Sequence, residues 1–246
     1  SAPHSSRWPA QATEAARGAG RRALRQTEPV PDCRALYQAA RLDPALAVLE
    51  GFHALKHALR FGADILEAAT ADLPGILALA ADLAPDIADR LPALLDELPA
   101  GEFARLTPSP PPTPVVALAR RPITSPETAW DRPGTVVLLD RPNHLGNVGA
   151  AVRVAAAAGA AALLTTGERD PWHPTALRGS AGLHFALPVV RLAGPLPAGR
   201  PLVAVVPGGS PLWEATLPPQ AVLAFGGERH GLDPALLASA DARVGI

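Results

Sequence analysis

The chain has 246 residues, of which 48% are hydrophobic, and a net charge of −1. This length is sufficient for one large or two ordinary domains, and the hydrophobic content excludes a globally disordered chain. Because the net charge is near zero, a nucleic-acid partner would have to bind a local basic patch. Cys33 alone cannot build a disulfide framework, and neither an apolar run of about 18 residues nor a signal-peptide pattern is present, so we expect a cytoplasmic protein with no membrane partner.

The first segment, residues 1–34, is polar and basic. Two interpretations stay open: a flexible or loosely helical arm, and a basic arm that binds RNA phosphates. Its arginines are Arg17, Arg21, Arg22 and Arg25.

Residues 35–122 form a first block in which strands alternate with helices, and this alternation predicts a small α/β layer domain. His53 and His57 have the spacing of helical metal ligands, but no third ligand accompanies them, so we expect no metal site. Strands are expected at 45–49, from about Ala63 and at 115–119, and helices at about 52–61, where Gly62 ends the helix, and further on up to about Glu97.

Residues 123–133 have the composition of a linker, and from Gly134 onward strands, loops and helices alternate regularly. The strand candidates are short and apolar on both faces, which is typical of a parallel sheet covered by helices on both sides. They are "TVVLLD", "AALLTT", "FALPVV", "PLVAVV" and "AVLAFG", and the helices are expected near 148–158, 174–181 and 233–239.

The stretch "LLDRPNHLGNVGAAVRVAAAAG" runs from Leu138 to Gly159 and resembles a nucleotide-binding turn. A dinucleotide site requires G-x-G-x-x-G directly after the strand, whereas Gly146 and Gly149 have the spacing G-x-x-G. Glu168 follows the second strand, where a ribose-binding carboxylate is expected, so an NAD-type oxidoreductase stays open as an alternative. That alternative does not explain Arg153, in the helix that follows.

Three motifs resemble those of the SpoU/TrmH family of RNA ribose methyltransferases, within the SPOUT superfamily. The first is D-(x6)-N-x-G-A-x-x-R from Asp140 to Arg153, the second is R-x-S-A-G from Arg178, and the third is G-x-E-x-x-G-L from Gly226. "VLEGFHALKHAL" and "TPVVALARRP" resemble the small ribosomal-protein-like domain that binds the substrate in many members. The resemblance covers residues 40–246 and implies a parallel-sheet methyltransferase domain with a trefoil knot.

The implied reaction is the attack of a ribose 2′-hydroxyl on the methyl group of S-adenosylmethionine, without a metal. Arg153, Asn147 and Glu228 are the implied catalytic residues. Arginine is a poor general base, so Arg153 is expected either to hold a phosphate and stabilise the alkoxide or to relay the proton to a phosphate. Glu228 is expected to orient Arg153 or to contact the substrate.

Structural alternatives stay open for these three residues: a solvent-facing helical arginine, a helix N-cap for Asn147, and a solvated loop carboxylate for Glu228. The expected cofactor contacts are Gly226, Gly231, Leu232 and Ile246 by resemblance, and Thr165 because it ends the second strand at the carboxyl edge of the sheet. The expected RNA contacts are Arg178, Ser180, Arg120 and Arg121.

The resemblance also implies a homodimer and one further motif, after the three above, whose first residue would be Ile246. Ribosomal RNA is favoured over transfer RNA as the substrate, because members with the small N-terminal domain mostly act on ribosomal RNA. A non-catalytic RNA-binding relative is a further alternative, against which the presence of all three implied catalytic residues argues.

Overall fold

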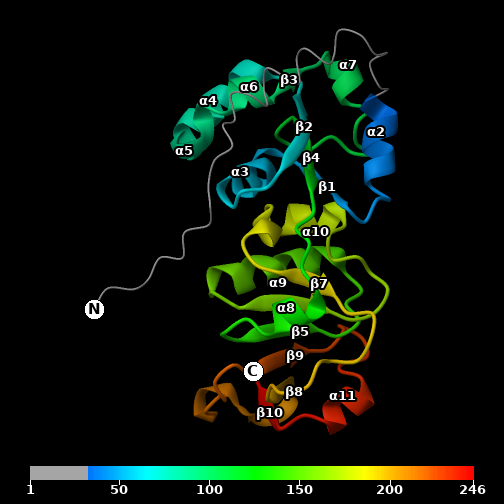
Figure 1. Ribbon diagram of the computed structural model, residues 1–246, viewed down its shortest axis with the longest axis vertical. Helices are drawn as coiled ribbons and strands as arrows, with labels where there is room; N and C mark the ends of the chain where they lie inside the picture. Colours follow the sequence, from blue (N-terminus) through cyan, green and yellow to red (C-terminus); the bar gives the residue numbers. More distant parts are fainter. Residues whose placement is uncertain (1–32) are drawn as a thin grey trace, which may run out of the picture.

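The computed structural model describes residues 33–246, which form two α/β units, one above the other (Figure 1). The predicted basic arm, residues 1–34, lies outside the described residues except for its last two, which begin helix α2 (Cys33–Ala40). Within the described part of the chain, no helix is both long and apolar enough to cross a membrane.

The first unit is built on a four-stranded sheet with the strand order β1-β4-β2-β3. Strand β4 is antiparallel to β1 and β2, and β3 is parallel to β2. The predicted first strand, first helix and last strand of this block are confirmed as β1, α3 and β4, each within one residue of the expected bounds. The elements are β1 (Leu46–Glu50), α3 (Phe52–Arg60), β2 (Ile65–Thr70), α4 (Leu73–Leu83), α5 (Pro85–Ala88), α6 (Leu91–Leu94), β3 (Asp96–Glu97), α7 (Ala100–Phe103) and β4 (Val115–Arg120).

The helical stretch expected up to Glu97 is divided into α4, α5 and α6 and ends in the short strand β3. Asp72 caps α4 by accepting the backbone N–H of Gly75 at 2.9 Å. Pro85 and Pro92 lie in the first turns of α5 and α6. A proline has no N–H to donate to the preceding turn, so each one starts a new helix instead of extending the previous one.

The second unit contains a six-stranded sheet with the order β10-β8-β9-β5-β6-β7, in which all pairs are parallel. The predicted parallel α/β fold is therefore confirmed. Helix α9 begins three residues earlier than expected, at Leu145. The elements are β5 (Val136–Leu139), α9 (Leu145–Ala157), β6 (Ala162–Thr165), α10 (Pro174–Gly179), η1 (Leu183–Phe185), β7 (Val189–Arg191), β8 (Leu202–Pro211), η2 (Leu212–Glu214), β9 (Val222–Phe225), α11 (Pro234–Ala238) and β10 (Ala242–Gly245).

The segment predicted as a linker, residues 123–133, contains helix α8 (Pro126–Trp130). Ser125 caps this helix by accepting the N–H of Thr128. Trp130 is buried, and its indole N–H donates to the carbonyl of Ala198 at 3.0 Å. This segment is therefore packed against the second unit, because burial of a large aromatic ring and a satisfied indole N–H hold it in place.

One large hydrophobic cluster spans the two units. Helix α10 lies between them (Figure 1) and packs against both α9 and β1. The shared cluster contains Leu49 and Leu55 from the first unit together with Leu163 and Leu177 from the second. The boundary predicted near residues 123–133 therefore separates two topologies that are packed together through this cluster, in addition to the clusters within each unit.

A buried histidine stabilises the turn that follows α10. His184 Nε2 lies 2.8 Å from the carbonyl oxygen of Pro171, and Nδ1 lies 2.7 Å from Ser180 Oγ. The carbonyl can only accept, so Nε2 carries the proton and Nδ1 accepts from the Ser180 hydroxyl. Desolvation by burial lowers the pKa of His184 to about 4.

We expect His184 to make the folded state less stable at mildly acidic pH. The unfolded histidine, with a pKa of 6.5, takes up a proton that the folded one does not accept until about pH 4. Its contribution is therefore complete above pH 6.5 and is lost as the pH falls toward 4, by about 2 kcal/mol between pH 7.5 and pH 5. Urea unfolding at both pH values measures this change. His184→Gln should lack that part of the pH dependence, and an unchanged dependence in this variant would contradict the assignment.

Candidate active site

The loops after β5, β6 and β9 meet at the carboxyl edge of the six-stranded sheet. Strands β5 and β9 are neighbours, but the chain leaves β5 toward β6 on one side and leaves β9 toward β10 on the other. A reversal of this kind opens a crevice in which parallel α/β sheets bind their ligands.

Asp140, at the end of β5, joins these three loops. Its buried carboxylate accepts the hydroxyl of Thr166 at 2.5 Å and the backbone N–H of Asp233 at 2.7 Å. It also pairs with Arg141, which has a left-handed backbone with φ of 47°. A buried carboxylate needs several donors to offset its desolvation, so it fixes the loops that supply them. The only sequence signal for this role was an acid at the end of an apolar strand.

Asn147 and Glu228 come together across two of these loops, although 81 residues separate them in the chain. The Asn147 side-chain amide donates to Glu228 Oε1 at 2.7 Å, and both residues are exposed. Hydrogen bonds from its own backbone N–H and from Asn147 lower the pKa of Glu228. Asn147 is the third residue of α9, whose N-cap is His144, so the expected N-cap role of Asn147 is wrong.

Arg153 lies apart from this pair. It is exposed on α9, six residues beyond Asn147, which corresponds to about 9 Å along the helix axis. Within residues 33–246 it makes no hydrogen bond or ion pair. Glu228 therefore contacts Asn147 instead of orienting Arg153 within the same chain.

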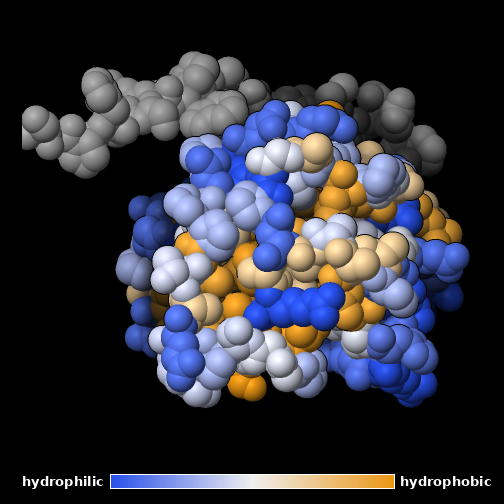
Figure 2. All heavy atoms as spheres, turned by 90° about the horizontal axis from the view of Figure 1, so that it is seen from below, coloured by the Kyte–Doolittle hydropathy of each residue, from blue (hydrophilic) through white to orange (hydrophobic). Residues whose placement is uncertain are grey.

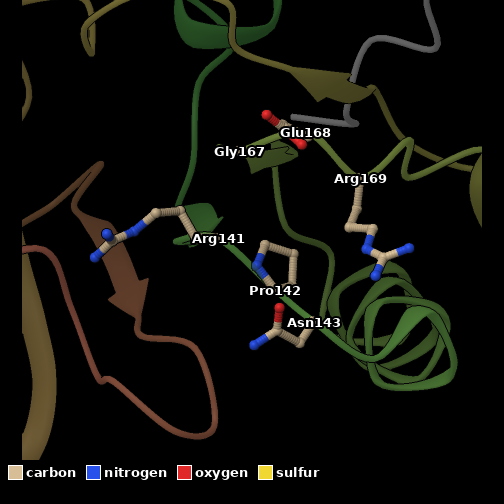
Figure 3. Close-up of a pocket in the computed structure, with 6 residues that line it drawn as sticks. All are labelled: Arg141, Pro142, Asn143, Gly167, Glu168 and Arg169. Carbon is tan, nitrogen blue, oxygen red and sulfur yellow. The ribbon is translucent and has the colours of Figure 1, made fainter.

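A cavity of about 600 Å³ opens beside the Asn147–Glu228 pair. Pro142 and Asn143 lie at its centre, with Arg141 on one side and Arg169 on the other (Figure 3). The Asn143 backbone N–H is 3.5 Å from Glu228 Oε2, which joins the cavity to the pair. Glu168, the carboxylate expected after the second strand, also lines the cavity, so the lining combines charges of both signs with polar and apolar groups, as expected of a pocket for a charged organic ligand.

The glycines of the β9 loop fold it tightly against itself. A Cβ on Gly226 would lie 2.1 Å from the carbonyl carbon of Gly231, and Gly227 and Gly231 exchange two backbone hydrogen bonds. Gly231 has φ of +65°. The Leu232 side chain is buried in the core beneath the sheet. The N–H and carbonyl of Gly231 are therefore engaged by Gly227, and a cofactor contact at Leu232 would have to use its backbone, because its side chain is buried.

The two other expected cofactor contacts differ in accessibility. Thr165 is fully buried, and its hydroxyl has no hydrogen-bond partner among residues 33–246. Ile246 is 90% exposed. Thr165 thus carries an unsatisfied buried polar group directly below the loop that contains Thr166, and such a group is unusual in a folded core.

Most of the expected RNA contacts lie away from the loop cluster. Ser180 is fully buried and bonded to His184, so its assignment as an RNA contact is wrong. Arg121 is largely buried and pairs with Asp170 at 2.8 Å. Arg120 is exposed beside Asp64 on the first unit. Arg178 pairs with Glu50 at the junction between the units.

Residues 134–246 match the model of the SpoU rRNA Methylase family. This part of the chain is a SpoU methylase domain. The loops that carry Asp140, Asn147 and Glu228 all belong to this domain, and the predicted family resemblance is confirmed.

The SpoU methylase domain is similar to curated and structurally characterised proteins. A 23S rRNA (uridine(2479)-2′-O)-methyltransferase of Streptomyces viridochromogenes is 33% identical over 124 residues, which cover 45% of this chain and 43% of the relative. The matched region is thus less than half of that protein.

Two crystal structures extend the similarity over both units. An AdoMet-bound rRNA methyltransferase from Sinorhizobium meliloti is 26% identical, with a TM-score of 0.66 over 87% of this chain and 84% of that one. The SpoU methyltransferase AviRb from Streptomyces viridochromogenes, in complex with AdoMet, is 22% identical, with a TM-score of 0.69 over 87% and 86%. The second of these similarities supports the fold alone.

Proposed function

We propose that this protein transfers a methyl group from S-adenosylmethionine to a ribose 2′-hydroxyl of RNA, with ribosomal RNA favoured over transfer RNA. The observation that carries the proposal is the Asn147–Glu228 contact beside the cavity at the carboxyl edge of a SpoU methylase domain. The rRNA specificity of the relatives supports the choice of substrate. A ribosomal RNA substrate also supports a cytoplasmic location.

The residues present fit the cofactor. The β9 loop presents closely folded backbone at Gly226 and Gly231, and the unsatisfied hydroxyl of Thr165 lies at the end of β6. Backbone at such an edge can hold an adenosine without any charged side chain. S-adenosylmethionine supplies an activated methyl group and needs no metal. The exposed carboxylate of Glu228 adds a negative charge that complements a sulfonium.

Glu228 is suited to orienting the substrate. A carboxylate whose pKa lies below its usual value is a weak base, so it stays ionised and accepts hydrogen bonds. Asn147 holds Oε1 of this carboxylate, and Oε2, which lies 3.5 Å from the Asn143 N–H, has a further lone pair to accept a ribose hydroxyl. Arg169 borders the cavity and offers donors to a phosphate next to the target ribose, whereas the Arg141 guanidinium pairs with Asp140 and Asp233.

The dinucleotide alternative loses its structural basis. Gly146 and Gly149 lie inside α9 and do not form a phosphate-binding turn before the helix. Gly149 instead makes room for α10, because a Cβ there would lie 2.2 Å from the carbonyl oxygen of Ala176. The first motif therefore serves helix packing and the Asn147–Glu228 contact.

A homodimer is part of the proposal. Val154, next to Arg153 on α9, is 66% exposed, and Trp213 in η2 is 80% exposed. Figure 2 views the end of the molecule that carries β8, β10 and α11, and it shows hydrophobic surface between hydrophilic side chains. Apolar surfaces of this kind are typical of subunit interfaces.

The test is methyl transfer from methyl-labelled S-adenosylmethionine to purified 23S rRNA and to tRNA. We expect label on ribose 2′-oxygens of the 23S rRNA and little label on tRNA. S-adenosylhomocysteine should raise the melting temperature of the protein, because a ligand that binds the folded state stabilises that state. NAD, which should not bind, should leave the melting temperature unchanged. Stabilisation by NAD, or the absence of transfer to any RNA, would overturn the proposal.

A further inference from the structure

A second cavity lies at the junction of the two units, apart from the active site. It has a volume of about 230 Å³ and is bordered by Arg41, Glu50 and Ser109 from the first unit and by His173, Thr175 and Arg178 from the second. The active-site cavity shares none of these residues. Both units contribute cationic and hydroxyl groups to one concave surface.

The charge of this cavity is set by an unusual ion-pair arrangement. The Glu50 side chain is 1% exposed, and its two oxygens are taken by different arginines: Arg41 at 2.7 Å on one and Arg178 on the other. Two guanidinium groups against one carboxylate leave an excess of one positive charge. Each guanidinium has five N–H donors, of which Glu50 engages few, so donors remain for a further anion.

Neutral donors complete the lining. His173 Nδ1 accepts the backbone N–H of Thr175 at 3.1 Å, which places the proton of the neutral ring on Nε2 as a donor. The side chains of Thr175 and Ser109 are exposed and carry hydroxyl groups. A cationic, donor-rich pocket open to solvent has the chemistry of a phosphate-binding site.

The position of the pocket connects it to the catalytic loops. Arg178 precedes Gly179, whose Cβ would lie 3.0 Å from the carbonyl oxygen of Gly146 in α9. Gly146 precedes Asn147. An RNA backbone bound at the junction would thus lie against helices α9 and α10. Helix α9 also carries Asn147.

We propose that the Arg41–Glu50–Arg178 cavity binds a phosphodiester group of the RNA substrate and thereby aligns the two units on one RNA strand. The inference rests on the proposed function for the identity of the RNA. Glu50 holds the two arginines in position and limits their net charge to one.

Opposite changes at the ion pair test this site. Arg178→Gln removes the excess charge, and we expect the Kd for 23S rRNA to rise about fivefold at 0.1 M salt, with the salt slope reduced by about 0.7, as for the loss of one phosphate contact on a single strand. Glu50→Gln adds one positive charge to the cavity, and we expect it to lower the Kd. A purely structural ion pair would instead make both variants bind more weakly, because both break the same contacts.

A matched pair of controls corrects for overall charge. Arg60 and Asp86 form an exposed ion pair on the first unit, outside the cavity lining. Arg60→Gln and Asp86→Asn change the net charge as the two test variants do, and we expect each to change the Kd less than twofold. Effects as large as those of the test variants would overturn the proposal.

A further variant leaves the ion pair intact, in case the test variants do not fold. Thr175→Glu places a negative charge at the exposed rim and should raise the Kd at least about fivefold, by the same loss of one phosphate contact, while Thr175→Gln should not. Equal affinities of these two variants would overturn the site. Methyl transfer by the wild-type protein is measured separately. RNA binding that depends on these charges, without any methyl transfer, would contradict the proposed function but support the phosphate site.

Discussion

Arg153→Ala is expected to lower kcat by about 10²-fold or more with little change in cofactor Kd, as for a group that acts only in the transition state. The arginine is exposed and has no polar partner within residues 33–246, so its loss leaves no buried group unpaired and the fold intact. Arg153→Lys should not restore activity, because an ammonium cannot make the planar two-point contact of a guanidinium with a phosphate. Single-turnover methyl transfer and calorimetry with S-adenosylhomocysteine measure the two quantities.

If the protein is a homodimer, as we propose, Arg153 is expected to act in the active site of the partner subunit, because it lies apart from Asn147 and Glu228 of its own chain. Co-expression of Arg153→Ala with Glu228→Gln distinguishes the two arrangements. If the residues act across a dimer interface, each mixed dimer keeps one intact site and regains activity that neither variant has alone. If they act within one chain, every site in the mixed dimer lacks one group and activity stays absent. A near-normal kcat of the alanine variant would remove Arg153 from the mechanism.

The strands of the second unit could be predicted because each is recognisable from its own short run of apolar residues. Buried parallel strands are apolar on both faces, and β5, β6 and β9 appear in the sequence as short apolar runs followed by polar loops. The start of α9 was placed too late because Leu145 and Gly146 are not N-terminal helix signals, whereas Asn147 is a strong one. The Asn147 amide is instead bonded to Glu228, a partner 81 residues away that no local pattern reveals.

The site residues show the same limit. Asn147, Glu228 and the β9 loop were expected together, and the fold brings them to one edge of the sheet. Arg178 and Ser180 belong to one motif but have different surroundings, because the first unit packs on α10: Ser180 is buried against His184 and Arg178 meets Glu50. Burial against another unit depends on tertiary packing, so the sequence pattern alone could not separate these two residues.

Gly149→Ala is expected to destabilise the protein by roughly 3 kcal/mol, at the upper end of the usual cost of overpacking. A Cβ at this position would lie 2.2 Å from the carbonyl oxygen of Ala176 and 2.8 Å from the Cα of Gly179. Both are backbone atoms of α10, which is held between the two units and cannot move away as a flexible side chain would. Equilibrium unfolding in urea measures the loss.

Gly146→Ala, three residues earlier on the same helix, is the matched control. A Cβ on Gly146 would have nothing within 4 Å, so only helix propensity changes, and alanine should stabilise the helix by up to about 1 kcal/mol. The opposite signs of the two stability changes distinguish steric contact from helix propensity, because propensity alone would make both variants more stable. Displacement of α10 in Gly149→Ala should also shift α9 relative to the β9 loop and weaken the Asn147–Glu228 contact, so methyl transfer should fall with stability. A Gly149→Ala protein as stable as Gly146→Ala would show that the two helices do not pack as closely as the structure describes.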